Sequence, residues 1–401
     1  MNISDFVLSI ISKIEDAGFE AYAVGGCVRD SLMGKVPMDW DLTTSALPEE
    51  IQRIFESEKV IPTGIKHGTV TVIMEHNPVE ITTFRIDGKY TDSRHPSNVT
   101  FSNDIFQDLA RRDFTINAMA YNPKMGLVDP FGGQGDLMHG IIRTVENANE
   151  RFSEDALRIM RAIRFSATLG FEIEEETSSA LFCCRDLLAD ISAERIASEL
   201  NKILLAENPW PILAKNLPVL EKRLFDNEFN SKTTLFENLG YIPPVLSQRL
   251  AVFLCHTADK NPVVAQEFFT RLKYDTKTRH RVIAILENLD AEFLPDRIAI
   301  RKHLRRLGAD CLSDIMSVKS TLGHSVANSK AILDKIISNN DCFSLKQLDI
   351  TGNDLKEHFG LSGREIGSVL DKLLDAVIEE KCENKKDTLL SYFKSVSENI
   401  Y

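Results

Sequence analysis

The chain has 401 residues, 43% of them hydrophobic, and a formal net charge of −12. This length predicts about two to four domains, and no apolar run approaches the ~20 residues of a membrane-spanning helix. The acidic balance excludes binding of nucleic acid over the whole surface but allows a local basic groove. Seven cysteines without CxxC spacing predict free thiols in a reducing cytoplasm.

Helix and strand patterns alternate over the first 145 residues. Residues 1–18 show the pattern of an amphipathic helix, with Ser4 as its N-cap and Gly18 at its end. A second helix is predicted over residues 47–57, where Pro48 suits the first turn. Runs rich in Val, Ile, Thr and aromatic residues predict strands at residues 21–26, 40–45, 68–74, 79–84 and 116–122.

Helical periodicity dominates from residue 146 onward. Residues 153–170 predict one helix, with Ser153 as its N-cap and Gly170 closing it. We therefore predict an α+β head, built on a small mixed β-sheet with helices, followed by an all-α neck, body and tail in an elongated multidomain chain. The predicted domains are residues 1–145 for the head, 146–205 for the neck, 206–290 for the body and 291–401 for the tail.

Two aspartates, Asp39 and Asp41, are separated by one residue at the start of a predicted strand. Residues i and i+2 of a strand face the same side, so both carboxylates would point to one place and repel unless a cation lies between them. Two oxygen ligands suit Mg²⁺, which completes its shell with water and substrate phosphates. The alternative is a pair of solvated aspartates at a strand end.

A third carboxylate and a glycine turn extend this hypothesis. The strand at residues 79–84 is expected to lie beside the strand at residues 40–45, and it carries Glu80. Three carboxylates on adjacent strands can hold two metal ions, although Glu80 could equally face outward. The pair Gly25–Gly26 allows backbone N–H groups to approach a phosphate with Arg29 beside it, although most glycine pairs are only turns.

Two groups of arginines have spacings that suit an anionic partner. Arg111 and Arg112 precede Asp113. These arginines are predicted either to form a salt bridge with Asp113 or to bind a triphosphate. A carboxylate and three arginines recur every third residue along the helix predicted at 153–170: Asp155, Arg158, Arg161 and Arg164. They would lie along one side of that helix, and the alternative is pairing between acidic residues and arginines within the helix.

Two basic clusters occur in the C-terminal half. The first comprises Arg271, Lys273, Lys277, Arg279 and Arg281, and the second comprises Arg297, Arg301, Lys302, Arg305 and Arg306. Each predicts either a phosphate-binding surface or a solvated helix face.

Five segments carry a resemblance to a known family. In order over residues 21–205, "GGCVRD…DWD", "RRDFTINAMA", "DPFGGQGDL", "EDALRIMRAIRF" and "ERIASELNKILL" resemble the motifs of class II tRNA nucleotidyltransferases, the CCA-adding enzymes. These enzymes belong to the polymerase-β-like nucleotidyltransferase superfamily. The segment "ITGNDLKEHFGLSGREIGSVLDKLLDAV" resembles the tail of short bacterial members. Longer relatives carry a phosphohydrolase domain marked by His-Asp dipeptides, none of which occurs in this sequence.

The resemblance implies a cytoplasmic, Mg²⁺-dependent enzyme that adds C, C and A to the 3′ end of tRNA from CTP and ATP. It implies no membrane association and no obligatory protein partner. It assigns Mg²⁺ to Asp39 and Asp41, to which our strand argument adds Glu80 as a third catalytic carboxylate. It assigns nucleotide binding to Gly26, Arg29, Arg112, Asp155, Arg158, Arg161 and Arg164. The tRNA acceptor arm and elbow are expected to contact Arg271, Lys273, Lys277, Arg301, Lys302, Arg305 and Arg306.

Asp155 and Arg158 suit a template-independent choice of bases. Cytosine and adenine both present an amino donor beside a ring-nitrogen acceptor, which match a carboxylate and a guanidinium. Uracil and guanine invert this pattern. The polar segment at residues 85–100 is predicted to be a loop beside the site. It resembles the loop that the family links to the final adenosine, so shortening it is expected to stop addition of A and spare addition of C.

Three alternatives remain at the level of sequence. Bacterial poly(A) polymerases share the head motifs, and such an enzyme would use ATP only and accept generic RNA ends. A partial enzyme that adds only CC or only A would also share them. A non-catalytic tRNA-binding protein would keep the basic clusters without needing the paired aspartates.

Overall fold

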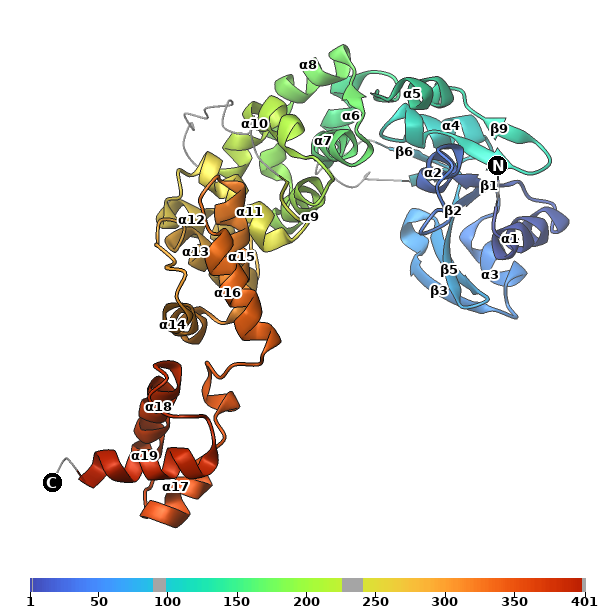
Figure 1. Cartoon of the computed structure of the whole chain (residues 1–401). Helices are drawn as coiled ribbons and strands as arrows, with labels where there is room; N and C mark the ends of the chain where they lie inside the picture. Colours follow the sequence, from blue (N-terminus) through green and yellow to red (C-terminus); the bar gives the residue numbers. More distant parts are fainter. Residues whose placement is uncertain (2, 89–98, 226–240, 399–401) are drawn as a thin grey trace. The chain divides into compact units, whose positions relative to one another are not determined.

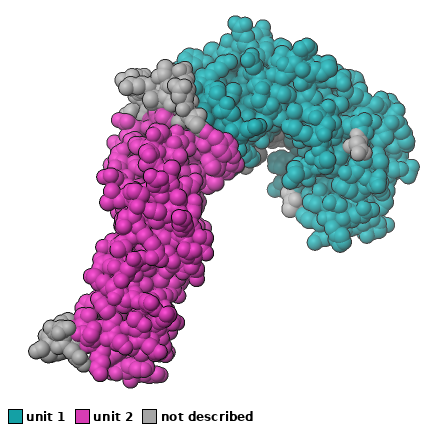
Figure 2. All heavy atoms as spheres, viewed as in Figure 1, with its two compact units in different colours: residues 1–233, 271–273 teal, residues 234–270, 274–401 magenta. Residues whose placement is uncertain are grey.

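The computed structural model of this chain describes residues 1, 3–88, 99–225 and 241–398. The chain folds as two compact units, Met1–Thr233 with Arg271–Lys273 and Thr234–Thr270 with Tyr274–Tyr401 (Figure 2). The predicted head and neck lie together in the first unit, and the predicted division into four domains stays a prediction. No helix within the described ranges has the length and apolar character needed to cross a membrane.

A seven-stranded mixed sheet organises the head, in the order β3-β4-β5-β2-β1-β8-β9 (Figure 1). Its strands are β1 (Ala21–Val24), β2 (Asp41–Thr44), β3 (Lys59–Gly64), β4 (Thr69–Met74), β5 (Asn77–Thr83), β8 (Ala120–Asn122) and β9 (Gly126–Val128). The β2–β5 pair is parallel, and the other neighbours are antiparallel. The predicted small mixed sheet is therefore confirmed. Strand β3 was not predicted, because Pro62 weakens a strand pattern; β3 lies at the sheet edge, where proline is tolerated.

Helices and short strands surround this sheet. They are α1 (Asp5–Asp16), α2 (Gly26–Leu32), α3 (Pro48–Ile54), β6 (Arg85–Asp87), β7 (Val99–Phe101), α4 (Ile105–Ala110) and α5 (Gly133–His139). Helix α1 buries Val7, Ile10, Ile11 and Ile14, the helical spacing that the sequence predicted. Strands β6 and β7 pair with each other at the two ends of the predicted loop, but residues 89–98 lie outside the described residues.

The rest of the first unit is mostly helical. It contains β10 (Ile141–Ile142), α6 (Ala148–Glu154), α7 (Leu157–Leu169), β11 (Glu172–Ile173), α8 (Glu175–Cys183), α9 (Ala193–Leu204) and α10 (Trp210–Leu224). The prediction of one helix starting at Ser153 is wrong, because α6 ends at Glu154 and α7 begins at Leu157. The side chain of Asn147 caps α6, whereas Ser153 lies inside that helix and donates to the Asn149 carbonyl.

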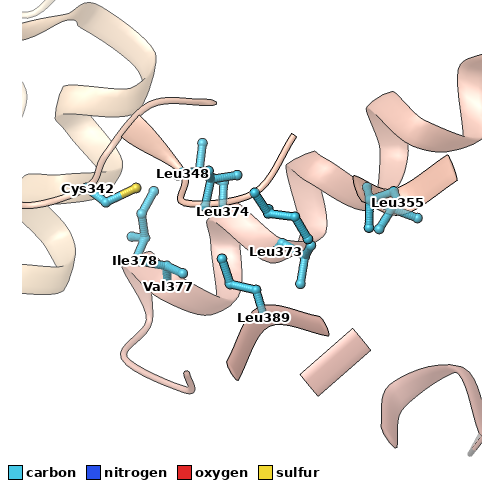
Figure 3. Close-up of a cluster of buried hydrophobic side chains, with 10 residues drawn as sticks. Cys342, Leu348, Leu355, Leu373, Leu374, Val377, Ile378 and Leu389 are labelled. Atoms are coloured by element: carbon cyan, nitrogen blue, oxygen red, sulfur yellow. The ribbon is translucent and has the colours of Figure 1, made fainter. Parts of the chain in front are cut away.

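The described part of the second unit is built from helices. They are α11 (Leu246–Thr257), α12 (Pro262–Arg271, whose last residue belongs to the first unit), α13 (Thr276–Glu287), α14 (Arg297–Leu307), α15 (Ala309–Thr321), α16 (Ala327–Ser338), α17 (Gly352–Phe359), α18 (Arg364–Ile378) and α19 (Lys386–Glu398). Leu373 and Leu374 of α18 share a buried apolar cluster with Leu355 of α17 and Leu389 of α19 (Figure 3). The predicted all-α tail is thereby confirmed.

Candidate active site

Two carboxylates meet where β2 and β5 run in parallel. Asp41 opens β2 and lies opposite Glu80 in the register of the pair. Asp39 lies in the turn before β2, so the prediction that both aspartates belong to one strand is wrong. Trp40, between them, is only 6% exposed and anchors this turn in the core. The two aspartates therefore flank a fixed residue at the end of a strand.

The electrostatics around Asp41 favour a cation. Asp41 is open to solvent on one side, yet its surroundings raise its pKa to about 6. Loss of hydration is the largest cause, the charges of Glu80 and Asp39 add to it, and the Arg112 guanidinium opposes it. Carboxylate oxygens held against like charges are the donors that Mg²⁺ prefers. Within the described ranges, no three His, Cys, Asp or Glu side chains form a ready-made metal cluster, so the third-ligand role of Glu80 stays a prediction.

We expect divalent metal binding to weaken as the pH falls through about 6, the raised pKa of Asp41. Below this value the carboxyl is protonated and protons compete with the cation, whereas above it the carboxylate is free to bind. Because one proton competes with the metal ion, the metal affinity is expected to fall about tenfold for each pH unit below the pKa of Asp41. Calorimetric titration with Mn²⁺ across this range measures the effect, and a flat affinity would remove Asp41 from the metal site.

A chain of hydrogen bonds links α2 to α7. Arg29 donates to Oδ1 of Asn117 at 2.7 Å, and Asn117 Nδ2 donates to Asp113 Oδ1 at 3.1 Å. The other oxygen of Asp113 accepts from Arg161 Nε at 2.7 Å. Burial alone would raise the pKa of Asp113, but the charge of Arg161 and the Asn117 hydrogen bond outweigh it and lower the pKa to about 2. Asp113 is thus a permanently ionised link between Arg29 and Arg161.

Three guanidinium groups surround the ring of Phe165, which is buried on α7. The guanidinium carbons of Arg29, Arg161 and Arg164 lie 5.2, 5.3 and 4.2 Å from the ring centroid. The face of an aromatic ring attracts cations, so Phe165 offsets the repulsion among three like charges. Glu199 of α9 also pairs with Arg164 at 2.7 Å. Sequence reasoning missed Asn117, Phe165 and Glu199, although the quoted motifs contain all three.

Arg111 and Arg112 are not partners of Asp113. Both guanidinium groups bind Asp108 of α4, at 2.7 Å from Arg111 and 3.3 Å from Arg112. The alternative of a salt bridge with Asp113 is therefore wrong, and the partner is one helical turn earlier in the chain. Arg112 remains close enough to Asp41 to influence its pKa, which places it beside the carboxylates.

Asp155 and Arg158 flank the junction between α6 and α7. Asp155 has extended backbone angles, and its Oδ1 accepts from the Leu157 N–H at 3.0 Å. Arg158 is 7% exposed and donates to Glu154 at 2.7 Å. It also donates to the carbonyls of Arg151 and Arg111. Base reading by Arg158 therefore requires a nucleotide to replace part of these contacts.

The second basic cluster is engaged inside the second unit. Arg301 is 4% exposed and donates to the carbonyls of Cys342 and Ile378. A side chain buried in this way does not reach a phosphate at the surface, which corrects the prediction of tRNA contact by Arg301. Its basic neighbours pair with other residues: Lys302 with Glu379, Arg305 with Asp371 and Asp375, and Arg306 with Asn288.

The first basic cluster is more open. Lys277 is exposed, Lys273 pairs with Glu194 at 2.8 Å, and Arg281 pairs with Asp314 at 2.9 Å. The exposed pair of Lys273 and Glu194 is weak, so a phosphate can replace it, whereas the pair of Arg281 with the buried Asp314 is part of the second unit's structure. Contact with tRNA by Arg271, Lys273 and Lys277 stays a prediction, as it does for Lys302, Arg305 and Arg306.

Replacing Arg301 with methionine is expected to lower the free energy of unfolding of the second unit by ~2–4 kcal/mol, because two buried carbonyls lose their donors. The matched variant Lys302→Met removes a half-exposed pair with Glu379 and is expected to cost less than ~1 kcal/mol. Urea unfolding of both variants measures the difference. Equal stability would show that the burial of Arg301 has no structural role.

Three family models match successive parts of the chain. The "Poly A polymerase head domain" matches residues 21–143, and the "Probable RNA and SrmB- binding site of polymerase A" matches residues 170–215. The "tRNA nucleotidyltransferase domain 2 putative" matches residues 247–393. Polymerase-β-like nucleotidyltransferases generally depend on a divalent metal ion.

Whole-chain relatives agree with these matches. The CCA-adding enzyme of Geobacillus kaustophilus is 36% identical and covers 96% of this chain and 95% of its own length. The crystal structure of the Bacillus stearothermophilus CCA-adding enzyme in complex with CTP has a TM-score of 0.80 at 31% identity, over 98% of this chain and 97% of that one. The Thermotoga maritima CCA-adding enzyme complexed with tRNA shares the fold, with a TM-score of 0.66 at 23% identity, over 98% of this chain and 96% of that one. This chain therefore belongs to the CCA-adding enzymes, the class II tRNA nucleotidyltransferases.

Proposed function

We propose that this chain adds C, C and A to the 3′ end of tRNA in the cytoplasm, using CTP, ATP and Mg²⁺ and releasing pyrophosphate. The observation that carries the proposal is Asp41, whose pKa is raised to about 6 beside Glu80, Asp39 and Arg112. Carboxylates that favour a cation lie here next to a guanidinium that favours a phosphate. The match to CCA-adding enzymes over almost the whole chain supports complete CCA addition over a partial activity or poly(A) synthesis.

In the reaction, the 3′-hydroxyl of tRNA attacks the α-phosphorus of the incoming nucleotide. The new P–O bond forms, the hydroxyl proton passes to water, and the bond between the α-phosphorus and the leaving pyrophosphate breaks. Asp39 and Asp41 would hold Mg²⁺, which would supply Lewis-acid activation of the hydroxyl and neutralise charge on the phosphates. Glu80 lies opposite Asp41, where it can strengthen this acidic site.

The arginines and the glycine turn bind the triphosphate. Arg29, Arg161 and Arg164 gather around Phe165, and Arg112 lies beside Asp41. Guanidinium groups form short charge-assisted hydrogen bonds with phosphate oxygens. Gly26 begins α2, where backbone N–H groups without a helical partner can add to this binding.

Asp155 and Arg158 choose the base. The carboxylate accepts from the amino group of cytosine or adenine, and the guanidinium donates to the adjacent ring nitrogen. The exposed residues of the basic clusters hold the tRNA by its phosphates and shape rather than by its sequence. The proposal requires neither a membrane nor an obligatory protein partner.

One assay tests the function against its alternatives. Transfer RNA lacking its 3′ end is incubated with CTP, with ATP and with both, and the products are sequenced. CCA addition predicts two cytidines with CTP alone and complete CCA ends with both nucleotides. Long A tracts on generic RNA would indicate a poly(A) polymerase, an arrest at CC or a requirement for a CC end would indicate a partial enzyme, and no product would indicate a binding protein.

A further inference from the structure

One buried carboxylate lies at the centre of the candidate site without touching any proposed substrate position. The side chain of Asp108, on α4, is 0% exposed. Its Oδ1 accepts from Nε and Nη2 of Arg111, at 3.0 and 2.7 Å. Its Oδ2 accepts from Arg112 at 3.3 Å and lies 3.1 Å from the hydroxyl of Thr43. The resemblance to known enzymes assigned this residue no role.

We infer that Asp108 is a positioning residue that holds Arg112 over the glycine turn and fixes it relative to the strand that carries Asp41. This inference rests on the proposed function, because it gives a role to an arginine expected to bind the triphosphate. Arg112 lies directly above the turn: a Cβ atom at Gly25 would be 3.1 Å from its Nη1. Without a fixed partner, the long arginine side chain would sample many rotamers there.

Thr43 provides the connection to the catalytic strand. It lies two residues after Asp41 on β2, so both side chains face the same side of the sheet. Its hydroxyl lies 3.1 Å from Asp108 Oδ2 and 3.1 Å from the Thr82 carbonyl of β5. When the Thr43 hydroxyl donates to Asp108, it connects Asp108 to β2, the strand that carries Asp41.

Arg111 extends the connection to the base-reading arginine. Its guanidinium is held by Asp108, while its backbone carbonyl accepts from Arg158 at 2.9 Å. Asp108 thus fixes the turn that Arg158 binds, as well as the side chain of Arg112. A single carboxylate is linked to the groups proposed for the metal, the triphosphate and the base.

Charge explains why an aspartate suits this position. Burial alone would raise the pKa of Asp108, but the charges of Arg111 and Arg112 outweigh burial and lower it. The carboxylate is therefore ionised, and its bonds to both guanidiniums are charge-assisted, the stronger kind of hydrogen bond. Asparagine would keep the shape but not the charge, and its amide nitrogen cannot accept from a guanidinium.

The decisive variant is Asp108→Asn, assayed in the full-length chain. We expect the KM for CTP and for ATP to rise about tenfold, as for loss of one charged hydrogen bond, and the KM for tRNA to change less than about twofold. The matched control is Asp314→Asn, which removes a 7% exposed aspartate that accepts from Ser247, Gln248 and Arg281. This control is expected to lower thermal stability without moving either KM. An unchanged nucleotide KM in Asp108→Asn would overturn the inference.

A double-mutant cycle separates positioning from a general loss of structure. If Asp108 acts through Arg112, then Asp108→Asn adds little to the KM of an Arg112→Met enzyme, whereas full additivity contradicts the inference. Thr43→Val replaces the hydroxyl that contacts Asp108 with a methyl group, and it tests the inference even if Asp108→Asn does not fold. This variant is expected to raise the KM for each nucleotide about threefold. An unchanged KM would contradict the inference. A wild-type chain that adds no nucleotides would instead overturn the proposed function itself.

Discussion

Asp41→Asn and Asp39→Asn are each expected to lower the rate of nucleotide addition by at least about a thousandfold while tRNA affinity changes less than about twofold. Asparagine keeps the shape of each side chain but removes the negative charge that attracts a divalent cation. Loss of hydration is the largest cause of the raised pKa of Asp41, and the negative charges of Glu80 and Asp39 add to it, so a cation at this place would stabilise the ionised carboxylates. Loss of one charge therefore weakens the metal site on which the reaction depends, and it changes none of the residues proposed to contact tRNA.

Single-turnover assays with saturating CTP and Mg²⁺ measure the rate, and filter binding measures the tRNA affinity. The control variant is Glu49→Gln, which neutralises an exposed carboxylate in the first turn of α3 and is expected to keep the wild-type rate. Near-normal turnover by either aspartate variant would refute the metal assignment. Loss of tRNA binding in parallel with activity would indicate a folding defect instead.

The head was largely predictable because its signals are local. The alternating strands at β4 and β5 and the apolar stripe of α1 each follow from residues close together in sequence. That β5 lies beside β2 was also predicted, whereas their parallel direction and the register that places Asp41 opposite Glu80 come from the structure. Such features depend on side-chain periodicity, which a sequence displays directly.

The charge partners were not predictable in the same way. Asp113 follows two arginines in sequence but binds Arg161, while Asp108 binds those two arginines. The pairs of Asp108 are local, with Arg111 and Arg112 three and four residues along the chain, but the partner of Asp113 lies 48 residues away and is brought to it only by the tertiary fold. A sequence shows which charges exist but not which of them meet. The same reason explains Arg301, which resembles a surface cation in sequence yet is buried against backbone carbonyls.

The helix boundary at Asp155 was predicted wrongly for a different reason. Asn147, Ser153 and Asp155 are all good N-cap residues, so local signals do not decide where a helix begins between them. The structure uses Asn147 for α6 and places Asp155 between the helices. This corrected position has a functional consequence, because Asp155 both binds the Leu157 N–H and is the proposed reader of the base.

Asp155→Ala is expected to weaken the choice of CTP over UTP by ~1–3 kcal/mol and to lower the use of both CTP and ATP. The carboxylate accepts from the amino group of cytosine but repels the carbonyl that uracil has in its place. Removing the carboxylate abolishes both the attraction and the repulsion. The kcat/KM for CTP divided by the kcat/KM for UTP is therefore expected to change more than the kcat/KM for UTP alone. Competition between CTP and UTP for the same tRNA measures that ratio.

Two further variants separate base reading from helix capping. Asp155→Ala also removes the hydrogen bond to the Leu157 N–H, a loss typical of an N-cap and worth ~1 kcal/mol of stability. Asn147→Ala removes the comparable cap of α6 and is expected to lower stability without changing base choice. Asp155→Asn keeps a carbonyl for the cap and can turn an amide donor toward uracil, so it is expected to accept UTP better than Asp155→Ala does. If all three variants keep the wild-type preference for CTP over UTP, then Asp155 only shapes the junction between α6 and α7, and the base is read elsewhere.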